Sequence, residues 1–348
     1  MSEAASLPII GLDIAKNVFQ VHQVDSETGE IRRRQIRRAK VVEFFSKLAP
    51  SLVAMEACGG AHHWARVLIR LGHKVKLLPA QHVKAFLLRD KTDALDAQAI
   101  WIAAHQKHLK EVAVKSELQQ ACLTLHSMRQ QLMKVRIMQT NALRGLLYEF
   151  GIALPVGHGR LPVAAREEIS RAQLDGQLPE VVVLSMQEQL KRIDLVQEDI
   201  DQLGRRLAEV LRQNQQMLAI AEIPGIGPLT ATALVASVGD ISMFKTARQF
   251  ASWLGLTPRQ TGTGGKTQQH GISKRGDSYV RTLLVAGARA VIARSARSGW
   301  VDRLLNRRHI NVVVVALANK MARAAWAVLT KGHAFDPCRW SPVEPSTV

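Results

Sequence analysis

Apolar residues recur at steps of three and four through residues 112–217, and this long helical period is the feature that most constrains the fold. In its second half the series is Met186, Leu190, Ile193, Val196, Ile200, Leu203, Leu207 and Val210, with a mean step close to the ~3.5 residues of a coiled coil. The glycines and prolines of GIALPVGHGRLP, at 151–162, interrupt the pattern. We therefore predict a long helical hairpin, a coiled-coil arm that serves as a spacer or a dimerising element.

Short extended patterns precede this arm. PIIGLDIA, VFQVHQVD and EIRRRQIRR are typical of strands, and the turn residues of DSETG separate the second from the third. Helical and apolar strand patterns then alternate until a last helix that includes KTDALDAQAI. The predicted order βββαβαβα gives an α/β domain over residues 1–111, with a mixed sheet covered by helices.

Positive charge is concentrated towards the two ends of the chain. Of the formal net charge of +18, residues 1–110 carry +7 (17 basic against 10 acidic residues), 111–214 carry none (13 against 13) and 215–348 carry +11 (17 against 6). Lys and Arg that neutralise phosphates release condensed counterions, so nucleic acid is the favoured partner. A membrane is the competing one, but the longest apolar run, Val312 to Ala318, is shorter than the ~18–20 residues that span a bilayer.

The N-terminus and the cysteines indicate a cytoplasmic protein. MSEAASLPII lacks the basic start and the long apolar region of a signal peptide. Cys58, Cys122 and Cys338 are too few and too scattered for a disulfide framework or a thiolate zinc site. We expect a globular protein of two or three domains, because 47% of its 348 residues are hydrophobic and can fill sizeable cores.

Four acidic residues occupy positions that the predicted fold would bring to one point. Asp13 ends the first strand, Glu56 ends the fourth, and Asp93 and Asp96 share one face of the last helix. Carboxylates that converge in apolar surroundings repel one another unless a cation lies between them. Oxygen ligands suit Mg²⁺, and two such ions about 4 Å apart would stabilise both reacting oxygens of a phosphodiester. In the alternative, Asp93 is a helix cap or an ion-pair partner of Arg89 or Lys91, and the acids that follow the strands are ordinary isolated ones.

The segment EIPGIGPLTATAL, at 222–234, opens the last third of the chain. Gly225 and Gly227 lie in a short connection between two helical patterns, where glycine lets backbone N–H groups approach an anion closely. The pattern resembles a helix-hairpin-helix, a turn that binds the DNA backbone. A glycine-rich connection without a ligand is the alternative.

The chain contains, in this order, GLDIAKNVFQVHQVD, AMEACGG, KTDALDAQAI, IPGIGPLTATAL, FASWLGLTPRQTGTGGK and GISKRGDSYVRTLLVAGARA. Together these segments resemble the DEDD transposases of the insertion-sequence one-ten family, and in particular its eleven-eleven subgroup, the RNA-guided bridge recombinases. The similarity extends from about residue 7 to about residue 340. The set in this order is far more specific than any one segment.

The resemblance implies a RuvC-like domain of RNase H fold at 1–111, in which Asp13, Glu56, Asp93 and Asp96 match the acidic tetrad that holds the metal. It implies a coiled-coil arm at 112–217 and, at 218–348, a mainly helical transposase domain with the helix-hairpin-helix and a nucleophilic hydroxyl. It also implies a noncoding guide RNA, a bridge or seek RNA, that pairs with donor and target double-stranded DNA. A homo-oligomer is expected, a dimer or tetramer with active sites shared between protomers, in the bacterial cytoplasm at the nucleoid and without a membrane partner.

The position of the nucleophile departs from the family pattern. Family members place a serine in the glycine-rich stretch after LTPRQ, and the matching stretch here, TGTGGK, has none. Five residues beyond Pro258 lies Thr263, whose hydroxyl we take as the nucleophile, although a β-branched oxygen is more hindered than that of serine. Thr261 and Ser273 are the alternatives.

Basic residues surround this stretch. Arg259, Lys266, Lys274 and Arg275 are predicted to bind phosphates near the broken bond, and Arg can grip a phosphate through two hydrogen bonds. A solvated basic loop is the alternative.

Two other patterns in the C-terminal third predict no nucleotide-binding or base-stacking role. QTGTGGKT differs from a phosphate-binding P-loop because Gln260 replaces its first glycine and no convincing strand leads into it. Trp253, Trp300 and Trp326 fall in apolar helical patterns, which predicts core positions.

Three functional classes follow from the sequence. The first is an RNA-guided site-specific recombinase that uses Mg²⁺ and a covalent hydroxyl. The second is a RuvC-like endonuclease that cuts branched DNA with metal-activated water and forms no covalent intermediate. The third is a nucleic-acid-binding protein without catalysis. A covalent protein–DNA link separates the first class from the other two.

Overall fold

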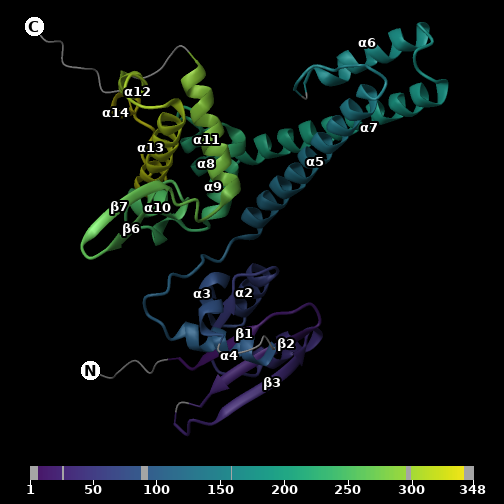
Figure 1. Ribbon diagram of the computed structural model, residues 1–348. Helices are drawn as coiled ribbons and strands as arrows, with labels where there is room; N and C mark the ends of the chain where they lie inside the picture. The colour runs from purple at the N-terminus through teal and green to yellow at the C-terminus, as the bar shows by residue number, and fades with distance from the viewer. Residues whose placement is uncertain (1–6, 26, 88–92, 158, 295–298, 341–348) are drawn as a thin grey trace, which may run out of the picture. The chain divides into compact units, whose positions relative to one another are not determined.

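The computed structural model describes residues 7–25, 27–87, 93–157, 159–294 and 299–340, without the side chains of residues 93, 94, 338 and 339. The chain forms two compact units (Figure 1). The first contains residues 1–116 with 238–243, and the second contains residues 117–237 with 244–348. The predicted arm and the C-terminal region thus fall in one unit, and the finer division into three domains stays a prediction.

A five-stranded sheet of order β3-β2-β1-β4-β5 forms the centre of the first unit. β1 (Ile9–Asp13), β2 (Val18–Val24) and β3 (Ile31–Arg37) are an antiparallel meander, and β4 (Leu52–Glu56) and β5 (Lys74–Leu78) extend the sheet parallel to β1. This is the mixed α/β arrangement that the sequence predicts, and it is consistent with a RuvC-like fold. β1 lies in the middle of the sheet, so its end is flanked by strands on both sides.

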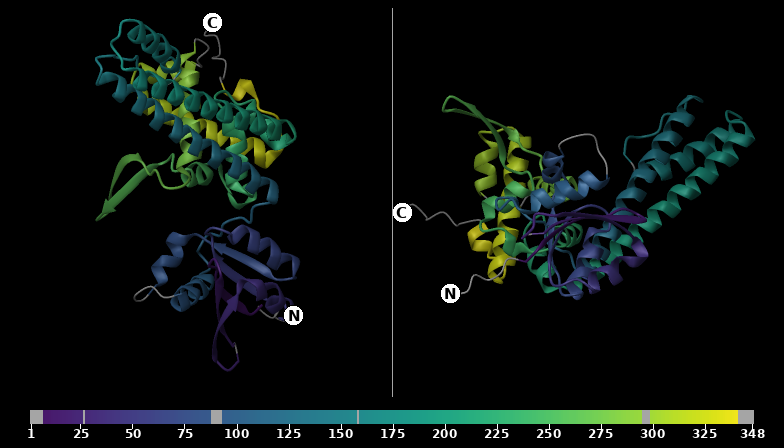
Figure 2. Two further views of the ribbon diagram at one scale, coloured as in Figure 1. Left: turned by 90° about the vertical axis from the view of Figure 1, so that its right-hand side faces the viewer. Right: turned by 90° about the horizontal axis from the view of Figure 1, so that it is seen from below.

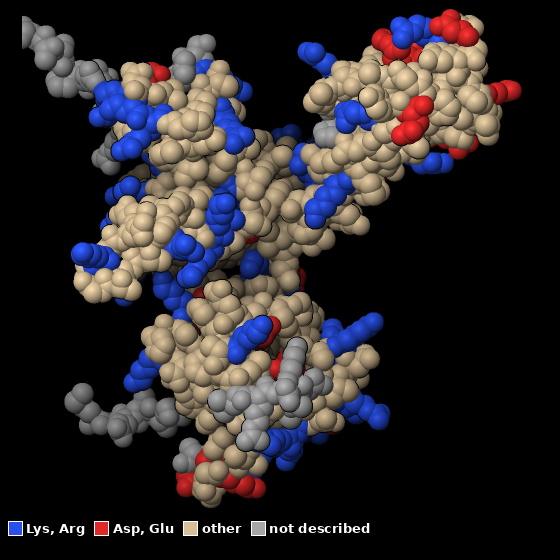
Figure 3. Space-filling view, viewed as in Figure 1, with Lys and Arg blue, Asp and Glu red and all other residues tan. Residues whose placement is uncertain are grey.

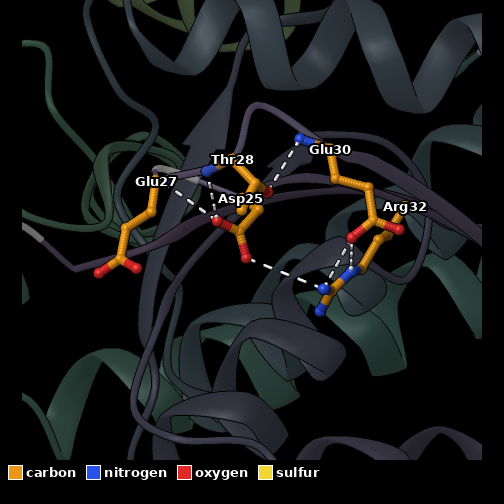
Figure 4. Close-up of polar contacts among 5 residues, drawn as sticks. All are labelled: Asp25, Glu27, Thr28, Glu30 and Arg32. Atoms are coloured by element: carbon orange, nitrogen blue, oxygen red, sulfur yellow. Dashed lines mark hydrogen bonds and ion pairs between the residues drawn. The ribbon is translucent and has the colours of Figure 1, made fainter.

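The turn between β2 and β3 is fixed by the side chain of Asp25 (Figure 4). Its Oδ1 accepts hydrogen bonds from the backbone N–H groups of Glu27 and Thr28, both at 3.0 Å. These two bonds, that of Thr28 first, lower the pKa of Asp25. The guanidinium of Arg32 donates to Glu30 at 2.8 Å across the start of β3. The predicted turn residues thus bond to their own backbone, which is why the chain reverses here.

Helices cover both faces of this sheet. Side chains alternate along a strand, and on one face Ile10 and Leu12 meet α1 (Val41–Ser46) and α2 (Ala61–Arg70) through residues such as Phe45. The other face is covered by α3 (Ala80–Val83) and α4 (Asp93–Ala104), with Ile100 in its buried cluster. Short 3₁₀ turns, η1 (Arg38–Lys40), η2 (Lys84–Phe86) and η3 (Ile241–Met243), complete the unit. The helix that carries two of the predicted acids therefore lies directly on the sheet.

The second unit begins with the predicted helical hairpin. α5 (Glu117–Tyr148) and α7 (Glu180–Arg212) lie along one another, and α6 (Leu161–Leu174) packs on α7 (Figures 1 and 2). Six of the eight predicted apolar positions of α7 are buried, namely Met186, Leu190, Ile193, Ile200, Leu203 and Leu207. The periodic side chains form the seam between the helices, while a coiled coil in the strict sense stays a prediction.

In the described part of the chain, seven helices follow the arm: α8 (Gln215–Ala221), α9 (Pro228–Val238), α10 (Ala247–Trp253), α11 (Ser278–Ala293), α12 (Gly299–Leu305), α13 (Ile310–Lys331) and α14 (Pro337–Trp340). α13 packs against α10 and α11 and buries Val313, Leu317 and Met321. Among the described helices, α13 alone is long and apolar enough to cross a membrane. One face of α13 is buried within the second unit.

Two strands interrupt these helices. β6 (Pro258–Thr263) and β7 (Lys266–Ile272) form an antiparallel two-stranded ribbon (Figure 1). The expectation that no strand leads into the glycine-rich stretch is wrong. A P-loop is nevertheless excluded, because it requires a helix after the loop and a second strand follows here.

Candidate active site

Asp13 and Glu56 stand side by side at one edge of the sheet. Leu12 pairs with Met55 in the parallel register of β1 and β4, and each acid is the next residue along its strand. The carboxyl ends of neighbouring parallel strands meet at the same edge. Both side chains are half-buried. Two of the four predicted acids are therefore brought together by the strand register alone.

α4 lies close against the end of β1. A Cβ atom added to Gly11 would come within 2.3 Å of the carbonyl oxygen of Ala97 and 2.8 Å of the Cβ atom of Trp101. The indole Nε1 of Trp101 also donates a hydrogen bond to the carbonyl oxygen of Ile9 at 3.1 Å. These contacts fix the helix lengthwise on the strand. Asp96, half-buried, precedes Ala97 and thus lies on the turn of α4 that covers β1.

The charges of the two strand-end acids reach a common neighbour. Burial raises the pKa of the Cys58 thiol, and the carboxylates of Glu56 and then Asp13 raise it further. Cys58 follows β4 and is half-buried. A thiol whose pKa is raised stays protonated, so Cys58 is no nucleophile here. Both strand-end carboxylates therefore lie close enough to Cys58 to act on its thiol.

The donor set suits a hard divalent cation in kind, because Asp13, Glu56 and Asp96 all offer carboxylate oxygens. Asp93 begins α4, but its side chain lies outside the described residues. Among the side chains that the structure describes, no three His, Cys, Asp or Glu form a ready metal cluster. The predicted tetrad therefore stays a prediction, with the described acids on three adjoining elements.

Thr263 lies at the tip of the ribbon. Gly264 and Gly265 form the turn with φ of 56° and 79°, left-handed values that favour glycine, so Thr263 and Lys266 are the last pair before it. Every residue of β6 is exposed. The hydroxyl of Thr263 is therefore open to a substrate. Ser273, half-buried, lies beyond the ribbon and donates its backbone N–H to Thr257 at 2.8 Å.

Thr261 has a partner that the sequence analysis did not single out. Its Oγ1 lies 2.6 Å from Nε2 of His270 across the ribbon. Residues two apart on a strand share a face, so Thr261 and Thr263 point the same way. The alternation of side chains along the two strands could have indicated this pair, but only if the register between β6 and β7 were known.

The four predicted phosphate-binding residues are all exposed, and none of them forms an ion pair within the described part of the chain. Figure 3 shows many basic and few acidic side chains over the ribbon and the C-terminal helices. Lys274 has φ of 53°, a left-handed value that is unusual for a residue with a side chain. The backbone beside it is tightly held, since a Cβ atom on Gly255 would lie 2.2 Å from the carbonyl oxygen of Arg275. Phosphate binding by Arg259, Lys266, Lys274 and Arg275 stays a prediction.

The connection between α8 and α9 has a packing explanation for one of its glycines. A Cβ atom on Gly225 would lie 2.7 Å from Cε of Met321 and 3.0 Å from the carbonyl oxygen of Gly287. A Cβ atom on Gly227 would meet nothing within 4 Å. Gly227 is thus the better placed of the two for an anion, and the helix-hairpin-helix stays a prediction.

Two segments of the chain match transposase families. Residues 10–152, with the acids of β1 and β4, match a DEDD transposase family of the IS110 type. Residues 217–302, with the ribbon, match the family described as Transposase IS116/IS110/IS902 family. The protein is a transposase, an enzyme that transfers DNA.

Relatives match along nearly the whole chain. The probable family 20 transposase of Pseudomonas aeruginosa is 45% identical over 95% of this chain and 99% of its own length. The transposase for insertion sequence element IS1111A of Coxiella burnetii is 38% identical over 94% and 91%, and that for IS1328 of Yersinia enterocolitica is 37% identical over 95% and 99%. The chain belongs to the IS110/IS116/IS902 family of DEDD transposases. Members of this class normally use divalent metal ions.

Proposed function

We propose that this protein is an RNA-guided, site-specific recombinase of an insertion sequence, which cuts and rejoins donor and target DNA with Mg²⁺ and a hydroxyl nucleophile. The observation that carries the proposal is the pair of carboxylates at the adjoining ends of β1 and β4, beneath α4, in a transposase. The proposal of a guide RNA is based on the six sequence segments that resemble the family.

The acidic edge is the proposed metal centre. Asp13, Glu56, Asp93 and Asp96 would hold Mg²⁺, two ions per site, through their carboxylate oxygens. When bound, the metal supplies positive charge that acidifies a hydroxyl and stabilises a phosphorane-like transition state. The close packing of Gly11 against Ala97 and Trp101 of α4 supports this proposal, because it holds the helix that carries Asp96 against β1.

Thr263 is the proposed nucleophile. Its oxygen bonds to the phosphorus and loses its proton, the bond from phosphorus to the 3′ oxygen breaks, and that oxygen takes up a proton. The strand is then joined to the protein through a threonine phosphate ester and has a free 3′-hydroxyl. Arg259, Lys266, Lys274 and Arg275 hold the phosphates beside the break. The ester conserves the bond energy, so a second 3′-hydroxyl can reseal the strand.

The proposed assembly shares each active site between two protomers. The acids belong to the first compact unit and the hydroxyl to the second. The protein would form a homo-oligomer, a dimer or tetramer, in which the acidic unit of one protomer works with the hydroxyl ribbon of another. Each cut would then require both protomers. The protein would act at the nucleoid, in the bacterial cytoplasm.

One observation favours Thr261 as a second candidate nucleophile. The His270 imidazole within 2.6 Å of its hydroxyl is the arrangement in which a base activates an alcohol. A RuvC-like endonuclease, which cuts with water, would need neither threonine.

Trapping separates these possibilities. The protein, Mg²⁺, its guide RNA and a nicked suicide DNA are incubated, and a protein–DNA adduct is sought by gel electrophoresis and mass spectrometry. We expect an adduct that Thr263→Ala abolishes and Thr261→Ala retains. Loss only in Thr261→Ala would assign the hydroxyl to Thr261. Cut ends without any adduct would replace the recombinase with the endonuclease, and cleavage that needs no RNA would remove the guide.

A further inference from the structure

A large open cavity lies beside the ribbon, entirely within the second unit. Its volume is about 1630 Å³, and its wall is formed by β6, β7 and α13 together with residues near α12 and α14. Pockets for small molecules usually measure ~300–1,000 Å³. The size therefore favours a chain-like ligand over a single small molecule.

The wall of this cavity is largely apolar, and its charged side chains are mostly basic. Arg259 and Lys274 reach it from the ribbon and its exit, and Lys320, Arg323 and Lys331 reach it from α13. Asp336 also lines the cavity and is the single acid among its lining residues. Arg323 and Lys331 are exposed on one side of α13. Basic side chains in such a wall favour a polyanion.

Tryptophans are interleaved with these cations. The sequence predicts Trp300 and Trp326 in the core, but both are half-buried and line the cavity. The Nζ atom of Lys320 lies 4.8 Å from the ring centroid of Trp300 and 4.7 Å from that of Trp340, and it donates to the carbonyl oxygen of Trp340. The ammonium group of Lys320 therefore packs on both rings. Trp253 is half-buried as well, but it packs among Phe244 and Phe250 and does not line the cavity.

We propose that this cavity binds unpaired nucleotides of the DNA strand that is cut at the ribbon, with bases against Trp300 and phosphates against Arg323, Lys274 and Arg259. Stacking on aromatic rings beside a basic groove is how single strands are bound without sequence preference. Paired bases are already stacked within the duplex, so a duplex cannot use Trp300 in this way. The cavity takes the part of this strand that lies beyond Thr263, because the end of the ribbon away from its tip lines it, at Pro258, Arg259 and 270–272. His270, the partner of Thr261, is among these residues, whereas Thr263 itself lies outside the lining.

The proposal deepens the proposed function and rests on it for the identity of the strand. Binding itself is measured without Mg²⁺, so that no step depends on chemistry. The full-length protein is titrated into labelled single-stranded DNA, duplex DNA and single-stranded RNA of one sequence, with fluorescence anisotropy and tryptophan quenching as readouts. Quenching reports stacking directly, which a general loss of charge would not change.

Trp300→Leu should weaken single-stranded DNA binding about tenfold and reduce the quenching, while Trp300→Phe should restore most of both. Arg323→Ala should lower the slope of log K against log salt by about 1. Arg205→Ala, an exposed arginine on α7, is the matched charge control and should change binding much less. Thermal unfolding of each variant checks that the fold is retained.

If the wild type and the folded Trp300→Leu variant bind single-stranded DNA with equal affinity, the proposal that the cavity binds unpaired nucleotides is wrong. A loss of duplex or RNA binding in Trp300→Leu as large as the loss of single-stranded DNA binding would also overturn the proposal. If Trp300→Leu weakens binding but no adduct forms in the trapping experiment, the cavity stands and the hydroxyl mechanism fails. If adducts form and Trp300→Leu binds normally, the reverse holds.

Discussion

Asp13 and Glu56 end neighbouring parallel strands one residue beyond the paired Leu12 and Met55, so backbone hydrogen bonding itself sets the two carboxylates side by side. Neither side chain has to search for the other. The helix that brings Asp96 is seated on the same strand through Gly11. This relationship makes the edge of the sheet the first place to test.

Asp13→Asn should lower the rate of metal-dependent cleavage at least about a hundredfold, because the neutral amide is a poor ligand for a hard cation. Guide RNA and DNA binding should remain. Mg²⁺ should raise the unfolding temperature of the wild type and not of the variant, since a ligand stabilises only a fold that binds it. Asp175→Asn, at an exposed carboxylate after α6, is the control and should behave as wild type. Wild-type cleavage by Asp13→Asn would remove this acid from the site.

Gly11→Ala should destabilise the first unit and reduce cleavage together. The new methyl would meet the carbonyl oxygen of Ala97 at 2.3 Å, so α4 must move. Overpacking of this kind costs about 1–3 kcal/mol, measured by chemical denaturation. Gly145→Ala is the matched control, since Gly145 is exposed on α5 with nothing within 4 Å. That substitution should be neutral or stabilise by about 0.5–1 kcal/mol through helix propensity. Equal stabilities of the two variants would contradict the close contact of α4 with β1.

Stability should decrease between pH 6.5 and pH 4 because of His126. Burial, then the positive charge of Arg129, lowers the pKa of this histidine from 6.5 to about 4, against an opposing effect of Asp277. Its ring nitrogens contact the hydroxyls of Tyr279 and Thr232, both at 3.0 Å. The unfolded chain therefore binds the proton first as the pH falls, and its contribution to stability is full above pH 6.5.

The expected loss over that window is on the order of 3 kcal/mol, since one pKa unit corresponds to about 1.4 kcal/mol. Urea unfolding at intervals from pH 7 to pH 4 measures it. His126→Gln should flatten the dependence, while His108→Gln, at an exposed side chain, should leave it unchanged. An unaltered slope in His126→Gln would show that other groups carry the acid sensitivity.

Lys274 should reveal both a charge and a backbone effect. Lys274→Ala and Lys274→Gly each remove one cation, so the slope of log K against log salt for DNA binding should fall by about 1 in both. Lys274→Gly should be more stable than Lys274→Ala by about 1 kcal/mol, because φ of 53° costs alanine and not glycine. An unchanged salt slope would remove Lys274 from the phosphate contacts.

The N-terminal fold could be predicted because its strands and helices carry apolar periods of different length. Ile10 and Leu12 alternate with Gly11 and Asp13, and the parallel placement of β4 follows from the helix between the strands. The ribbon escaped prediction for the opposite reason. All six residues of β6 are exposed, so it has no apolar face to give a period of two. Its one local signal was the Gly264-Gly265 pair, the sequence of a tight hairpin turn.

The candidate site was predictable in part. The positions of Asp13 and Glu56 followed from strand ends, and Thr263 from the resemblance alone. The Thr261 and His270 pair depends on the ribbon register, which no sequence pattern sets. The cavity arises from folding of α13 beside the ribbon, so Trp300 was indistinguishable from a core residue until its surroundings were known.

The ribbon buries no side chain fully along either strand. A lone two-stranded hairpin is only marginally stable in water, so most of the free energy that steadies its tip has to come from whatever it touches during the reaction. In the proposed mechanism, the Thr263 hydroxyl of the free enzyme would not yet be positioned for attack, and binding of DNA would position it. An enzyme that cleaves only after its DNA substrate is fully bound would cause little unproductive cleavage of the host chromosome.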